Sequence, residues 1–86
     1  HCAALNNLAA LRVKQGDTLA AASGFAATLR SCPDDATANY QLAVLSAASG
    51  DQSRAIFHLR MLLKSNPDAP TAGPARALLH KLGAEE

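Results

Sequence analysis

The chain has 86 residues, of which 49% are hydrophobic and only 3% aromatic, so its core must be built mainly from Ala and Leu. Eight basic and seven acidic residues give a formal net charge of +1 without blocks of like charge, whereas a nucleic-acid partner requires a strongly basic stripe. No apolar run approaches the roughly 20 residues of a membrane span. We therefore expect one small domain without nucleic-acid binding or membrane insertion.

The first part of the chain has the pattern of two helices joined by a tight turn. Leucines and alanines recur at helical spacing and predict a helix over residues 3–14. Gly16 supplies the backbone freedom that ends a helix, and Asp17 is a suitable cap for the next one. That second helix is expected over residues 18–31, because Pro33 prevents its continuation.

The same pattern returns further along the chain. A helix is expected over residues 35–48, Gly50 repeats the turn, and a fourth helix is expected over residues 52–64. A fifth helical pattern covers residues 71–82. The sequence therefore predicts an all-α fold of five helices in antiparallel helix-turn-helix pairs.

A shift of 34 positions aligns the chain with itself. Eleven of the first 34 residue pairs are identical, including Gly16 with Gly50 and Pro33 with Pro67. Residues that punctuate helices match together with the apolar ones, so the periodicity is more than an effect of composition. The chain divides into a first unit at 1–34, a second at 35–68, and a partial third unit with a capping helix at 69–86.

The helix faces that repeat between units give the predicted core. Ala9 and Ala43 occupy equivalent positions and are expected where two helices cross closely, so that Ala43→Leu would overpack the crossing by ~1–3 kcal/mol. The residues expected to be largely buried are Leu8, Leu11, Ala21, Phe25, Leu42, Leu45, Ala55, Leu59 and Leu63.

These units resemble the tetratricopeptide repeat. The resemblance implies an α-solenoid of helix pairs, with a concave face that holds a peptide or protein partner. Leu5, Asn39, Arg12 and Ser46 stand where the family has aromatic residues, so helix packing is expected to be thinner there. The matching residues are Leu8-Ala9 with Leu42-Ala43, Gly16-Asp17-Ala21-Phe25 with Gly50-Asp51-Ala55-Leu59, and the closing Pro33 and Pro67.

The residues able to carry chemistry are scattered. His1, His58 and His80 have no ligand-type partner at helical spacing, so we interpret them as surface or edge histidines. The aspartates fall at turns, where capping explains them. Cys2 and Cys32 fall at neighbouring ends of one hairpin, which makes a disulfide geometrically conceivable, but two free, partly buried thiols are the favoured interpretation. No catalytic residue, metal site or cofactor is expected.

The family resemblance implies that the partner contacts the first helix of each unit. Tyr40 is the one anchor-type side chain there, Val44 follows one turn later, and Gln41 offers a directional hydrogen bond. The basic clamp with which one subgroup binds chaperone C-termini is missing. Charge should matter little, because the face carries only Lys14 and Lys81. The predicted partner-binding residues are Asn6, Ala10, Lys14, Thr37, Tyr40, Gln41, Val44, Leu78 and Lys81.

The alternative function is structural, with the exposed helical ends packing on further repeats or on a second copy. The segments ALNNLAAL and PARALLHKL resemble the C-terminal repeats of bacterial envelope, polysaccharide-export and secretion assembly proteins, which implies a bacterial source. The chain opens at His1 without a Met or a signal segment, so it is expected to be a piece of a longer or processed protein. Enzyme activity would require residues of another domain.

Overall fold

The computed structural model describes residues 1–84, and this part of the chain contains helices and no strand. The ends of all five predicted helices are confirmed to within one residue. No helix in the described range is long and apolar enough to cross a bilayer. The helices are α1 (Cys2–Lys14), α2 (Thr18–Ser31), α3 (Ala36–Ala48), α4 (Gln52–Ser65) and α5 (Ala72–Lys81).

Aspartate and glycine set the boundaries of the helices, as the sequence predicts. The side chains of Asp17, Asp35 and Asp51 each accept a hydrogen bond from the backbone N–H three residues further on, at 2.9–3.1 Å. Each bond satisfies a donor that the first turn of a helix leaves without a partner. Gly16 and Gly50, with φ of +76° and +88°, adopt the left-handed backbone that ends α1 and α3.

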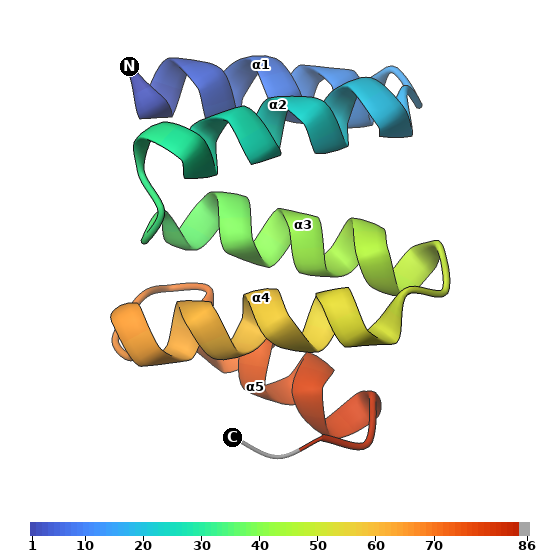
Figure 1. The fold of residues 1–86 in the computed structure, drawn as a ribbon, viewed down its shortest axis with the longest axis vertical. Coiled ribbons are helices and arrows are strands. Elements are labelled where there is room, and N and C mark those ends of the chain that lie inside the picture. Colours follow the sequence, from blue (N-terminus) through green and yellow to red (C-terminus); the bar gives the residue numbers. More distant parts are fainter. Residues whose placement is uncertain (85–86) are drawn as a thin grey trace.

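The helices form a stack of antiparallel hairpins (Figure 1). Helices α1 and α2 make the first hairpin, α3 and α4 make the second, and α5 packs on α4 at the opposite end from α1. Helices α2 and α4 run in the same direction on the same side of the stack. The arrangement follows the repeat in the sequence, since α1 corresponds to α3 and α2 to α4.

Two apolar clusters hold the stack together, and α3 contributes to both of them. The first cluster joins α1, α2 and α3 through Ala9, Ala21, Phe25, Ala38 and Leu42. The second joins α3, α4 and α5 through Ala43, Ala55, Leu59, Leu62, Leu63, Ala72, Ala75 and Leu79.

The two helices of the first hairpin approach each other at their smallest residues. A Cβ atom placed on Gly24 would lie 2.8 Å from the Cβ of Ala9, closer than side-chain atoms tolerate. Ala9 and Ala43 are both fully enclosed, with 1% and 0% of their surface exposed. The prediction of close crossings at these alanines agrees with this burial. Small side chains here let neighbouring helices gain contact that a larger residue would prevent.

The predicted burial of α1 is wrong at two leucines. Leu8 and Leu11 are 52% and 48% exposed, whereas the corresponding Leu42 of α3 is only 8% exposed. Leu42 packs against α2, but no helix in residues 1–84 occupies the same position relative to α1. Leu45, which corresponds to Leu11, is partly buried on the same cluster. The other six residues predicted to be core are buried.

The interpretation of the cysteines as free thiols is also wrong. Cys2 at the start of α1 and Cys32 directly after α2 form a disulfide with a Cα–Cα distance of 6.6 Å. The antiparallel hairpin brings these two ends together, within the range that a disulfide can bridge. The amide of Asn6 donates a hydrogen bond to Asp35 at 2.9 Å, which links α1 to the start of α3.

Reduction of the disulfide is expected to lower the free energy of unfolding by about 2–4 kcal/mol. The bridge joins residues 30 apart in sequence and so lowers the conformational entropy of the unfolded chain. Urea titrations with and without a reductant measure the difference. The double variant Cys2→Ser/Cys32→Ser serves as the control, and its midpoint should be low in both conditions. Identical midpoints for oxidised and reduced wild type would contradict this role of the bridge.

Candidate partner-binding surfaces

The predicted partner-binding residues of α3 lie along one side of that helix. Thr37 and Val44 are exposed, and Gln41 between them is partly buried. Tyr40 is half-buried and packs against the cluster shared by α3, α4 and α5, so part of its ring already supports the fold. These side chains form a mild, uncharged strip without a titratable group other than the phenol.

The remaining predicted residues lie at the two ends of the stack. Ala10 and Lys14 are exposed on α1, while Lys81 is exposed and Leu78 partly buried on α5. Asn6 is only 9% exposed, because its amide is engaged with the loop before α3. Helices α1 and α5 are at opposite ends of the molecule, with α3 between them (Figure 1). A partner that touched all the predicted residues would have to extend along the stack.

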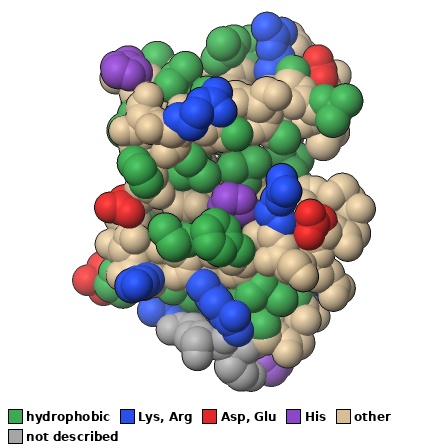
Figure 2. All heavy atoms as spheres, viewed as in Figure 1, with side chains coloured by type: hydrophobic (Ala, Val, Ile, Leu, Met, Phe, Trp, Pro, Cys, Tyr) green, Lys and Arg blue, Asp and Glu red, His purple; other side chains and the backbone are tan. Residues whose placement is uncertain are grey.

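A cleft that the sequence did not predict lies between α2 and α4, with a volume of about 630 Å³. Leu42 of α3 is among the residues that line it, and so are Ala22 and Ala26 of α2, whose small side chains leave the space open. Phe57 of α4 lines the cleft and is 58% exposed, a large amount for an aromatic ring. The hollow is visible between the two front helices, with a histidine inside it (Figure 2).

His58 is the polar residue at this site whose surroundings are best defined. Its Nδ1 lies 3.1 Å from Oδ1 of Asn39, whose amide nitrogen donates to the carbonyl of Pro33. Because Asn39 Oδ1 can only accept, Nδ1 of His58 carries the proton and Nε2 is left as an acceptor. The Phe57 ring also packs against the imidazole in a T-shaped arrangement, with a centroid distance of 5.3 Å. The side chain is therefore held in one orientation at the wall of the cleft.

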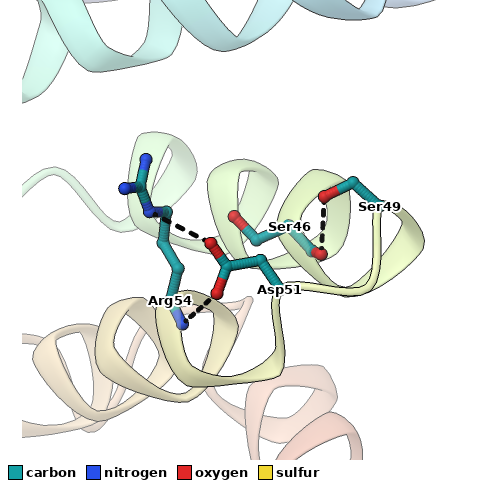
Figure 3. A network of polar contacts seen from close by, with 4 residues as sticks. All are labelled: Ser46, Ser49, Asp51 and Arg54. Carbon is teal, nitrogen blue, oxygen red and sulfur yellow. Dashed lines mark hydrogen bonds and ion pairs between the residues drawn. The ribbon is translucent and has the colours of Figure 1, made fainter.

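Two arginines supply the charge of the cleft, and no acidic residue of the described range lines it. Arg54 is partly neutralised by Asp51, since its Nε lies 3.5 Å from the carboxylate at the start of α4 (Figure 3). The two terminal nitrogens of Arg54 point away from that carboxylate. Arg30, in the last turn of α2, makes no ion pair within residues 1–84. The cleft thus combines an apolar lining with the positively charged guanidinium groups of Arg30 and Arg54, which can donate hydrogen bonds.

The sequence contained only a weak signal for this site. Phe57 corresponds to Ser23 in the first unit, so the 34-residue repeat does not single out its position. The informative combination is an aromatic residue on α4 opposite the small residues Ala22 and Ala26 of α2. Recognising it requires knowing that α2 and α4 lie side by side, which the helix pattern alone does not establish.

No group of three or more His, Cys, Asp or Glu side chains in residues 1–84 is placed to hold a metal ion. Comparison with known proteins adds no assignment. Neither the models of known protein families nor the curated proteins contain a match to this chain. The functional interpretation therefore rests on the two surfaces described above, the side of α3 and the cleft between α2 and α4.

The pKa of His58 is lowered from its ordinary value of 6.5, first by burial and second by the charge of Arg54. Below pH 6.5 the unfolded chain therefore binds more protons than the folded chain at this residue. The free energy of unfolding should fall as the pH decreases from 6.5 and should level off once the folded-state pKa has been passed. Denaturant titrations between about pH 5 and pH 8 measure this effect.

The variant His58→Gln isolates this contribution, because His1 and His80 remain in both proteins. Its stability should depend less on pH than that of wild type over this range. A second variant, Arg54→Gln, should raise the pKa of His58 toward its ordinary value, as NMR titration of the imidazole would show. Parallel stability curves for wild type and His58→Gln would contradict the assignment.

Proposed function

We propose that the chain is a non-catalytic protein-interaction module of the tetratricopeptide type, which binds a peptide or protein along the side of α3. Its partner contacts would centre on Tyr40, Gln41 and Val44, with the predicted residues of α1 and α5 at the edges. Because these side chains are mostly uncharged, the affinity would depend only weakly on salt.

The observation that carries the proposal is the amount of large apolar surface left uncovered. On α3, Val44 is 36% exposed and lies one turn after Tyr40, whose ring is only half-buried. Exposed apolar side chains that gather on a small protein mark surfaces for partners. The stacked hairpins supply a fixed support, so a partner would meet side chains that are already in place.

The disulfide supports a particular setting for this function. Such bonds persist in oxidising environments and are rare where glutathione keeps thiols reduced. The Cys2–Cys32 bridge therefore favours an oxidising compartment as the place where the module works. This setting is compatible with the resemblance to bacterial envelope and secretion assembly proteins.

Assembly is a second candidate function, and a specific observation favours it. Leu8 and Leu11 on α1 correspond to Leu42 and Leu45 on α3, which pack against α2. By analogy, the face of α1 that carries Leu8 and Leu11 could pack against another helix with an apolar face like that of α2. In that case α1 would join the chain to another helical unit or to a second copy.

Capture from a lysate of the source organism, followed by calorimetry on the captured partner, tests the proposal. Tyr40→Ala and Val44→Ser should each weaken binding, and loss of an anchor contact of this kind corresponds to about 30-fold in affinity. Val44→Ser is the cleaner variant, because Tyr40 also packs against the core. The exposed Gln52→Ala serves as the control and should bind as wild type does.

Equal binding by wild type and both α3 variants would contradict the proposed site. If Leu8→Ser then abolished capture, the assembly function would replace it. Thermal melts of each variant separate a lost contact from a lost fold.

A further inference from the structure

The cleft between α2 and α4 lies on a different surface from the proposed α3 site. Its apolar lining comes from all three helices that surround it, including Leu29 of α2, Leu42 of α3 and Phe57 of α4. An adjoining depression shares Ala22, Leu42 and Arg54 with the cleft and continues it toward the start of α2. The hollow therefore follows much of the length of the two helices.

Positive charge is placed toward both ends of this hollow. Arg30 belongs to the last turn of α2, and Arg54 lies in the first turn of α4. Because the two helices run in the same direction (Figure 1), these residues are separated along the cleft. Arg30 is the thirteenth residue of its helix and Arg54 the third of its own. At 1.5 Å of rise per residue, the axial separation is roughly 15 Å.

The charge continues beyond Phe57. A neighbouring depression on α4 shares Phe57 and is lined by Arg60 and Lys64, again with no acidic residue of the described range. Basic and hydrophobic side chains lie close together on this face of the molecule (Figure 2). A segment that approaches the cleft thus meets apolar surface in the centre and basic side chains around it, with Asp51 beside Arg54 as the acidic residue of the adjoining depression.

We propose that this cleft binds an acidic amphipathic helix of a partner protein. The apolar side chains of that helix enter between α2 and α4 and cover Phe57. Its carboxylates, about ten residues apart, pair with Arg30 and Arg54. An amphipathic helix laid into a groove by its apolar face is a recurring mode of peptide recognition.

Two other occupants fit these observations less well. An anionic membrane presents a broad surface that cannot reach Leu42, which is only 8% exposed at the base of the site. A second copy of the chain lacks the required charge pattern within residues 1–84. Its aspartates Asp17, Asp35 and Asp51 cap helices, and Asp34 and Asp68 lie in loops, so none sits on an apolar helix face.

The test uses a labelled 16-residue helical peptide with leucines on one face and glutamates at positions 3 and 13. Fluorescence anisotropy with the complete 86-residue chain should show saturable binding that weakens as salt is added. A peptide with lysine in place of both glutamates should bind at least tenfold more weakly. The same residues in scrambled order, without an apolar face, should not bind at all.

Variants of the chain locate the binding. Phe57→Ala should weaken binding of the acidic peptide at least tenfold, and Arg30→Gln should weaken it severalfold. Val44→Ser, on the α3 face, is the matched control and should leave the affinity unchanged, so this test is independent of the proposed function. Circular dichroism of each variant checks that the helices are retained.

Three results would overturn the proposal. The first is no saturable binding at millimolar peptide, and the second is equal affinity for the acidic and lysine-containing peptides. The third is an affinity that Phe57→Ala leaves unchanged. Binding to anionic phospholipid vesicles without binding to the peptide would assign the basic face to a membrane surface instead.

Discussion

The close approach of α1 and α2 at Ala9 and Gly24 is the constraint on which the rest of the first hairpin depends. There is no space for even one more carbon atom between these residues. The approach allows small side chains to form a packed interface despite the little apolar area that each one buries. The Cys2–Cys32 bridge fixes the other end of the same pair of helices. The relative position of α1 and α2 is thereby fixed by the Ala9–Gly24 contact along their length and by the disulfide where the chain enters α1 and leaves α2.

The position of α2 then determines the surfaces on both of its sides. Its inward face covers Leu42 of α3, and its small outward residues Ala22 and Ala26 leave the cleft against α4 open. Helix α3 packs against a helix on either side, whereas within residues 1–84 the main neighbour of α1 is α2. That difference explains why equivalent leucines are buried in one helix and exposed in the other.

A buried polar group joins the second hairpin to the cleft. Asn39 is 2% exposed, at a position where the first unit has Leu5. A buried amide is costly unless its hydrogen bonds are satisfied. Asn39 meets this requirement through Pro33 and His58, and the bond to His58 fixes the imidazole at the cleft wall. The resemblance implied thinner packing at Asn39, yet the residue is buried and carries a polar connection between two helices and a loop.

The sequence predicted the helices well because their determinants are local. Asp17 and Asp51 cap, Gly16 and Gly50 end helices, and the alanines mark the close crossings. It failed where burial or bonding depends on a neighbour distant in sequence. Leu8 was misassigned because its exposure reflects the helices available to cover it, and the cysteine pairing because two chain ends had to be placed together. The cleft requires α2 and α4 to be side by side, which no local pattern specifies.

The most direct test of the close-packing account is the unfolding free energy of Gly24→Ala. Helix propensity alone would make this variant more stable by about 1 kcal/mol, but overlap with Ala9 should cost ~1–3 kcal/mol, which cancels that gain or exceeds it. Ser23→Ala, at the exposed neighbouring position, is the control and should be neutral or slightly stabilising. Adding Ala9→Gly to Gly24→Ala should relieve the overlap, which a double-mutant cycle detects as favourable coupling. A Gly24→Ala protein that is more stable than wild type by about 1 kcal/mol, the full gain from helix propensity, would contradict the account.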